Sequence, residues 1–121
     1  MRRLLVVDDD PDVCTVISAF FHKNGFDVIT ASHNEDAWKK VQQFAPQVIL
    51  LDVLLSGSDG REFCRRLKAD NKTKHITVIM FSAHPGAAGQ INDYGADDFV
   101  PKPFHLHSLL QRVLHHMGAA V

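Results

Sequence analysis

Apolar residues recur along the chain in two spacings, and together these predict strands that alternate with helices. Apolar runs occupy 4–7, 48–51 and 76–81, with Thr77 as the single interruption. Runs without alternation are typical of strands that are buried on both faces of a parallel sheet. Two shorter segments rich in strand formers, 26–30 and 95–100, complete the set of predicted strands.

Between the strands, the apolar positions follow helical spacing. The first helix starts at Pro11, which suits the first turn, and ends at the stop signal Asn24-Gly25. Its apolar residues are Val13, Val16, Ile17, Phe20 and Phe21. Amphipathic patterns predict further helices at 34–44, 61–69 and 106–117.

The segment 84–93 has a weaker helical pattern. Pro85, Gly86 and Gly89 lower its helix propensity, since each Gly costs about 1 kcal/mol relative to Ala. We expect a short or mobile helix there. The alternation of strands and helices predicts an α/β domain with a central parallel sheet covered on both faces.

The composition is that of an ordinary globular protein. The chain has 121 residues, of which 45% are hydrophobic and 22% are charged, and this fits one domain, 1–121, with one core. The net charge of −1 gives no basic balance that would favour nucleic acid. The apolar runs are too short for a membrane span or a secretory signal. We therefore expect a cytoplasmic protein that does not bind a membrane.

The cysteines and the late histidines show no metal-ligand pattern. Cys14 and Cys64 fall at apolar positions of predicted helices, so we expect buried, unreactive thiols with no disulfide between them. The histidines near the end of the chain have no companion Cys or Glu that would complete a metal site, and we expect them to be solvated. They are His105, His107, His115 and His116.

Polar residues stand where four of the predicted strands end. Asp8 and Asp9 follow the first strand, Asp52 ends the third, Ser82 ends the fourth, and Lys102 comes after the fifth. The carboxyl ends of parallel strands lie along one edge of the sheet, where ligands bind. Three carboxylates there repel one another unless a cation joins them, and oxygen ligands suit Mg²⁺. A hydroxyl and an ammonium beside them suit a phosphoryl group, which a carboxylate can accept as an acyl phosphate.

Each of these residues also has an ordinary structural interpretation. The acidic run 8–10 suits the start of a helix, Asp52 and Ser82 suit turns, Lys102 suits the surface, and Phe99 suits the core. For any one residue alone, the structural interpretation is at least as good as the functional one. A site is favoured because the polar residues recur together at one edge of the predicted sheet.

A set of short motifs resembles the receiver domain of two-component response regulators. The motifs are Asp8-Asp9, Asp52, Asp59-Gly60, Ser82-Ala83, Phe99 and Lys102-Pro103. Each motif is weak alone, whereas all of them in this order, over 3–117, are specific. The resemblance implies a doubly wound, flavodoxin-like receiver fold with a five-stranded parallel sheet, five helices and strand order 2-1-3-4-5.

The resemblance implies a metal site and a phosphoacceptor. Asp52 matches the residue that is phosphorylated. Asp9 matches a direct metal ligand, and Asp8 matches a partner that acts through metal-bound water. The backbone carbonyl of Leu54 would also face the metal, which is Mg²⁺ in this reading, with Mn²⁺ as an alternative.

The resemblance also implies how the phosphoryl group is held and sensed. Ser82 would bond one phosphoryl oxygen, and Lys102 would pair with another. The Lys102–Pro103 peptide is expected to be cis. Phe99 matches an aromatic side chain that rotates with phosphorylation, so Ser82 and Phe99 would form the switch.

The implied function is a phosphorylation-dependent signalling switch. A sensor histidine kinase or a histidine phosphotransfer protein would supply the phosphoryl group, and the domain would catalyse only its own phosphorylation and dephosphorylation. The change would reach a downstream effector domain or protein through the fourth helix, the fifth strand and the last helix. We expect no direct nucleic-acid contact. Ser108 stands where dimeric receivers have an acidic partner, so we expect a monomer or a weak dimer.

Three features depart from the family pattern. Ser56 stands where a proline is common, and this bears on the rigidity of the loop 53–60. Phe99 replaces the commoner tyrosine, so only packing would hold its inward position. The segment between Ser82 and Lys102 is about two residues short, which lies within ordinary loop variation.

Three other functions are consistent with parts of the pattern. A haloacid-dehalogenase-type phosphatase uses similar residues, but it needs an acid two positions after the nucleophile, where Leu54 stands. A flavodoxin-like flavin-binding module needs a Ser, Thr and Gly-rich loop after the first strand, whereas the acidic run 8–10 would repel the flavin phosphate. A colourless protein would exclude the flavin module. A constitutive adaptor would not need the complete set of site residues.

Overall fold

A single parallel sheet organises the part of the chain that the computed structural model describes, residues 2–55, 57–83 and 94–118. The strands are, in spatial order, β2 (Phe26–Ala31), β1 (Arg2–Val7), β3 (Val48–Asp52), β6 (Thr77–Ser82) and β7 (Asp98–Pro101). All the pairings between them are parallel. The predicted parallel sheet and its order 2-1-3-4-5, counted over these five strands, are confirmed.

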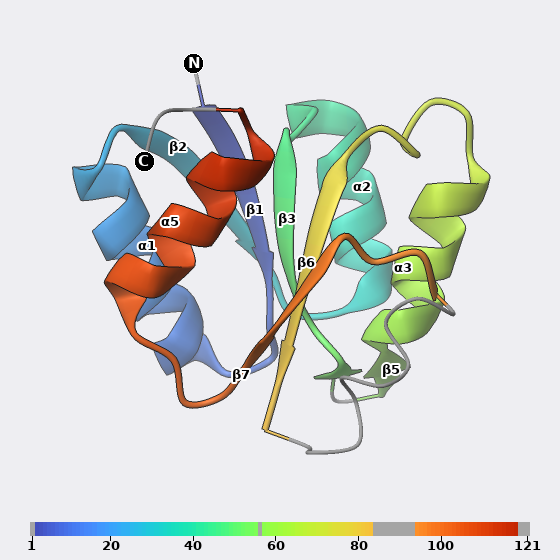
Figure 1. Ribbon diagram of the computed structural model, residues 1–121. Coiled ribbons are helices and arrows are strands. Elements are labelled where there is room, and N and C mark those ends of the chain that lie inside the picture. The colour runs from blue at the N-terminus through green and yellow to red at the C-terminus, as the bar shows by residue number, and fades with distance from the viewer. Residues whose placement is uncertain (1, 56, 84–93, 119–121) are drawn as a thin grey trace.

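Helices cover both faces of the sheet (Figure 1). α1 (Pro11–Lys23) and α5 (Leu106–His116) lie on one face, and α2 (Asn34–Phe44) and α3 (Gly60–Ala69) lie on the other. The described residues thus contain four of the five expected helices. The remaining helix was expected within 84–93, which lies outside the described residues. No helix in the described part is long and apolar enough to cross a membrane.

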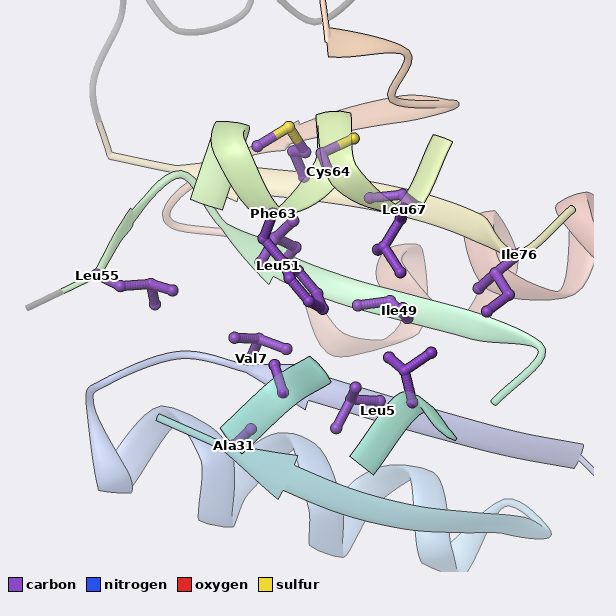
Figure 2. Packing of buried hydrophobic residues seen from close by; sticks show 14 of the residues in the cluster. Leu5, Val7, Ala31, Ile49, Leu51, Leu55, Phe63, Cys64, Leu67 and Ile76 are labelled. Atoms are coloured by element: carbon purple, nitrogen blue, oxygen red, sulfur yellow. The ribbon is translucent and has the colours of Figure 1, made fainter. Parts of the chain in front are cut away.

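The central strands are buried on both faces, as their unbroken apolar runs predicted. Neighbouring residues of β1 enter different clusters, since Leu4 joins the cluster of Phe21 in α1, and Leu5 joins that of Phe63 in α3. Figure 2 shows Leu5 and Leu51 in the cluster that also contains Phe63. A strand that is buried on both faces needs apolar residues at successive positions, which explains why these strands show no alternation of apolar and polar residues.

Short helix caps fix where the loops at the carboxyl edge turn. α1 follows β1 after three residues, and the side chain of Asp10 accepts a hydrogen bond of 2.9 Å from the N–H of Asp12. Asp59 caps α3 in the same way, by accepting from the N–H of Arg61 at 2.9 Å. These caps satisfy N–H groups that a helix leaves unpaired at its start.

The loop 53–60 is more regular than its Gly and Ser content predicted. It contains a small antiparallel hairpin, β4 (Leu54–Leu55) with β5 (Ser58–Asp59). Gly57 takes a φ of +72°, which lets the chain reverse within so few residues. α3 accordingly begins at Gly60, one residue before the predicted start. Ser56, whose effect on this loop was in question, lies outside the described residues.

The last strand is displaced from its predicted position at 95–100. Gly95 has a φ of +81°, which is incompatible with an extended strand, and β7 begins only at Asp98. Before it, the N–H of Asp97 donates to the carbonyl of Val78 at 2.8 Å. The side chain of Asp97 also accepts from Lys68 and from the N–H of Val78, so this turn is fixed to α3 and β6.

The cysteines and histidines differ in part from expectation. Cys64 is buried, whereas Cys14 is only half-buried, because α1 leaves its edge open beside Asp8. Both thiols are free and lie in clusters on opposite faces of the sheet, and burial raises the pKa of each to about 11. His116 is not simply solvated, since its Nε2 lies 3.0 Å from a carboxylate oxygen of Asp98. The other three late histidines are exposed.

Candidate functional site

Three carboxylates meet at the carboxyl ends of β1 and β3. Asp8 and Asp52 are buried, at 2% and 8% exposure, and Asp9 is exposed. One oxygen from each lies within 4.8 Å of the others. The parallel register pairs Val7 with Leu51, so the residues that follow these two arrive side by side. The structure thus brings together the acidic residues that the strand ends indicated.

Lys102 supplies the positive charge of the site. Its Nζ lies 3.0 Å from Oδ2 of Asp8 and 3.6 Å from Oδ2 of Asp52. The same ammonium lies 4.7 Å from the centre of the Phe81 ring, on which it stacks. The backbone holds Lys102 in place, because its N–H donates to the carbonyl of Ser82 at 2.9 Å. The peptide bond between Lys102 and Pro103 is cis.

The Asp52 carboxyl group holds its proton more tightly than a solvated one. Burial raises its pKa to about 6, and the negative charge of Asp8 acts in the same direction. The charge of Lys102 and a hydrogen bond from the N–H of Leu54 oppose this rise in pKa. Near neutral pH the group is therefore ionised but more basic than an ordinary aspartate, and both properties suit a nucleophilic carboxylate.

Ser82 lies at the same edge of the sheet, and Phe99 lies within the neighbouring strand β7. Ser82 ends β6, next to β3, and is 2% exposed. As predicted, it is the last residue of its strand. Phe99 lies in β7 opposite Met80 and packs, half-buried, against the cluster on the α2 and α3 face.

The hairpin β4–β5 closes the site beside Asp52. The N–H of Gly60 donates to the carbonyl of Val53 at 2.8 Å, and the N–H of Val53 donates to the carbonyl of Phe81 at 3.1 Å. These bonds place Leu54 immediately after the last pairing of the sheet. Its N–H bonds the Asp52 carboxylate, and its side chain is 43% exposed.

The donor set suits a hard divalent cation. The acidic cluster offers only oxygen atoms, two of its carboxylates are buried, and the ammonium of Lys102 offsets only part of their negative charge. Mg²⁺ prefers such ligands and keeps several waters, for which the exposed side of Asp9 leaves room. A hollow of about 430 Å³ opens next to Asp8 and Asp9, between α1 and α2.

Two residues near the site were not singled out for their contacts by the sequence. Gly60 was recognised as part of a motif. Only the structure shows that a Cβ added at this position would lie 2.0 Å from the carbonyl oxygen of Asp52. Asn34, the first residue of α2, donates a side-chain hydrogen bond to the carbonyl of Asp59 at 3.0 Å. An asparagine at a helix start is common, so no signal in the sequence pointed to this contact.

Comparison with known proteins agrees with this geometry. The family model described as response regulator receiver domain matches residues 4–114. The curated DNA-binding dual master transcriptional regulator RpaA of Synechocystis sp. is 36% identical over 119 residues. That match covers 93% of this chain and 48% of the relative, so the chain spans about half the length of the curated relative it matches.

Solved structures show the same fold over nearly the whole chain. A protein described as a response regulator, from Chloroflexus aurantiacus J-10-fl, gives a TM-score of 0.89 at 30% identity, over 97% of this chain and 98% of that one. The BeF3-activated N-terminal receiver domain of RstA from Klebsiella pneumoniae gives a TM-score of 0.86 at 26% identity, over 96% and 98% of the two chains.

Proposed function

The chain belongs to the family of response regulator receiver domains, and from this membership we propose that it is a phosphorylation-dependent signalling switch with Asp52 as its phosphoacceptor. One observation carries the assignment. The buried Asp52 carboxylate lies at the end of β3, with Asp8 and Asp9 on one side and the ammonium of Lys102 3.6 Å away. An aspartate in this setting is basic, ionised at neutral pH, and next to a cation that can hold an anionic phosphoryl group.

Transfer from a phosphohistidine would proceed by attack of an Asp52 carboxylate oxygen on phosphorus. The new oxygen–phosphorus bond forms as the phosphorus–nitrogen bond breaks, and the leaving imidazole keeps the electron pair of the broken bond. Lys102 would leave its contact with Asp52 to pair with a phosphoryl oxygen, while its contact with Asp8 keeps it in place. The Ser82 hydroxyl would donate to another phosphoryl oxygen. The domain would catalyse only this reaction and the later hydrolysis of its acyl phosphate.

Asp8, Asp9, Asp52 and the carbonyl of Leu54 would hold Mg²⁺, with Mn²⁺ as an alternative ion. The bound ion supplies charge neutralisation for the phosphoryl oxygens. The three carboxylates would orient it, and Asp8 would do so while it remains paired with Lys102. This proposal is supported by the oxygen-only donor set and by the burial of Asp8 and Asp52.

The switch would couple Asp52 to the surface formed by β7 and α5 and to the segment 84–93, which lies outside the described residues. Movement of Ser82 toward the phosphoryl group would free space that the half-buried Phe99 ring can enter. A sensor histidine kinase or a histidine phosphotransfer protein would be the donor. The output would pass to a downstream effector domain or protein in the cytoplasm, with no nucleic-acid contact by this domain.

The competing functions fit the observations less well. Leu54, whose side chain is 43% exposed, leaves a haloacid-dehalogenase-type phosphatase without its general acid. The buried Asp8 would repel the phosphate of a flavin at the loop where flavodoxin-like modules bind it. Neither family is the one whose model matches this chain.

The direct test is incubation with acetyl phosphate and Mg²⁺, followed by intact-mass measurement. We expect the addition of one phosphoryl group, which requires the divalent cation and is absent in Asp52→Asn. Beryllofluoride, which mimics an acyl phosphate, should bind the wild type and not the variant. A mass shift that persists in Asp52→Asn would rule out Asp52 as the acceptor.

A further inference from the structure

Asn34 connects the start of α2 to the hairpin that borders the phosphoacceptor. Its Nδ2 donates to the backbone carbonyl of Asp59 at 3.0 Å, across 25 residues of sequence. Its Oδ1 is buried and has no hydrogen-bond partner among the described residues. A buried carbonyl oxygen without a partner costs stability. An apolar side chain would avoid that cost, so stability alone does not account for an amide at this position.

The pairing pattern of the hairpin explains how the bond from Asn34 to Asp59 affects the orientation of Leu54. In β4–β5, Leu54 stands opposite Asp59, and the flanking bond runs from the N–H of Gly60 to the carbonyl of Val53. The Leu54–Asp59 pair is therefore of the kind without mutual hydrogen bonds, and the N–H and C=O groups of both residues point outward from the hairpin. On one side, the N–H of Leu54 reaches the Asp52 carboxylate. On the other side, the carbonyl of Asp59 reaches Asn34.

The hairpin is fixed more firmly to α3 than to α2. The Asp59 carboxylate bonds both the backbone and the guanidinium of Arg61, at 2.9–3.0 Å, so its end of the hairpin is tied to the start of α3. Toward α2, the bond from Asn34 constrains the hairpin backbone itself. Loss of that bond would let the hairpin pivot about Gly60, and the peptide of Leu54 would turn with it.

We propose that Asn34 is a positioning residue for phosphoryl transfer, which acts by holding Asp59 so that the Leu54 peptide keeps its orientation at the site. In that orientation the N–H of Leu54 stays on the Asp52 carboxylate, and its carbonyl stays available to the metal ion. The inference rests on the proposed function, because it assigns Asn34 a part in that reaction.

Two substitutions test the role of Asn34 in different ways. Asn34→Leu removes both the donor and the unpaired buried oxygen and keeps the branching at Cγ. Asn34→Asp keeps the shape, removes the donor, and sets a carboxylate against the Asp59 carbonyl. The matched control is Glu35→Ala, which changes the next residue of α2, is exposed, and leaves the hairpin untouched. Each protein is compared with the wild type for Mg²⁺ affinity, the rate of phosphoryl uptake from acetyl phosphate, hydrogen exchange of the Leu54 amide, and melting temperature.

We expect both Asn34 variants to bind Mg²⁺ about tenfold more weakly, as is typical when a residue that orients a metal ligand is lost. Phosphoryl uptake at subsaturating Mg²⁺ should slow by a similar factor, and the Leu54 amide should exchange faster. The melting temperature of Asn34→Leu should stay near that of the wild type, because the unpaired oxygen is removed with the bond. Glu35→Ala should match the wild type in Mg²⁺ affinity and rate.

The outcomes separate this inference from the proposed function. If the wild type takes up a phosphoryl group and the Asn34 variants do so with unchanged Mg²⁺ affinity, the positioning role is wrong and the function stands. If the wild type takes up none, the function is wrong. A lower melting temperature with unchanged Mg²⁺ affinity in Asn34→Asp would show a purely structural role, and this reading holds even if Asn34→Leu fails to fold.

Discussion

Gly60 packs against the backbone of Asp52 so closely that a Cβ at position 60 would lie 2.0 Å from the Asp52 carbonyl oxygen. The close approach brings the start of α3 against the end of β3. It also allows the N–H of Gly60 to reach the carbonyl of Val53 at 2.8 Å. The absence of a side chain at Gly60 therefore positions both Asp52 and the helix that follows it.

Gly60→Ala should destabilise the fold and displace Asp52. The new methyl group meets backbone atoms, which cannot rotate away, so we expect a loss of about 3 kcal/mol in the free energy of unfolding. Urea denaturation measures the loss, and Mg²⁺ titration should show weaker binding. Gly25→Ala is the control, since Gly25 also resists substitution, through its φ of +89°, but meets no atom within 4 Å. It should cost about 1–2 kcal/mol with unchanged Mg²⁺ affinity. Equal effects of the two substitutions would contradict the packing argument.

The raised pKa of Asp52 predicts a pH-dependent stability in the absence of metal. Its folded-state pKa of about 6 lies above the ordinary value of 3.8, so the folded state binds more protons between these values. The free energy of unfolding should therefore fall as pH rises from about 4 to about 6, and then level off. Because solvent reaches part of the carboxylate, we expect a loss of about 1–2 kcal/mol from this group.

Asp52→Asn should remove this pH dependence and raise the metal-free stability at pH 7.5. The substitution leaves the contact of 3.0 Å between Lys102 and Asp8 in place, so no buried charge loses its closest partner. Denaturation curves at pH 4, 5, 6 and 7.5 in EDTA provide the measurement. An unchanged pH profile in the variant would mean that Asp52 does not titrate in this range.

Mg²⁺ should stabilise the folded chain through the acidic cluster. At about ten times its dissociation constant, an ion that binds only the folded state adds roughly 1.4 kcal/mol. For a domain of this size, the corresponding rise in melting temperature is about 4–7 °C. Asp52→Asn should reduce the rise, whereas Asp27→Asn should not, because Asp27 is exposed near the amino end of β2. A wild-type melting temperature that is the same in Mg²⁺ and in EDTA would argue against a metal site.

The charges on β7 and α5 predict a monomer or a weak dimer. Arg112 pairs with Asp98 at 2.7 Å, His116 lies 3.0 Å from the same carboxylate, and Lys68 pairs with Asp97 at 2.8 Å. These acidic groups are neutralised within one chain, so charge pairs across a dimer would have to replace existing ones. Sedimentation with and without beryllofluoride should show mostly monomer at micromolar concentration. A tight dimer that forms on activation would show that these internal pairs are exchanged.

Part of the candidate site could be predicted because its residues lie at or directly after the ends of strands. Any parallel sheet brings the residues after neighbouring strands to one edge, so Asp8, Asp9 and Asp52 needed only correct strand assignments to be grouped. The cis peptide at Lys102–Pro103 came from the family resemblance, and the structure contains it. The sequence could not show that Lys102 would pair more closely with Asp8 than with Asp52, because that depends on how the chain after β7 crosses the edge.

The pattern of apolar residues was sufficient to predict the layers of this protein. Apolar runs without alternation indicate strands that are buried on both faces, and apolar residues at helical spacing indicate the helices that cover them. Both patterns can be recognised because the burial of a strand or helix sets the spacing of its apolar residues along the chain. The contacts between individual residues of different elements became known only from the folded structure. Asn34 meets Asp59, Gly60 meets Asp52, His116 meets Asp98, and α1 leaves Cys14 half-buried. Such contacts depend on the angle and the distance at which helices and strands pack, and the spacing of apolar residues along the chain does not reveal that geometry.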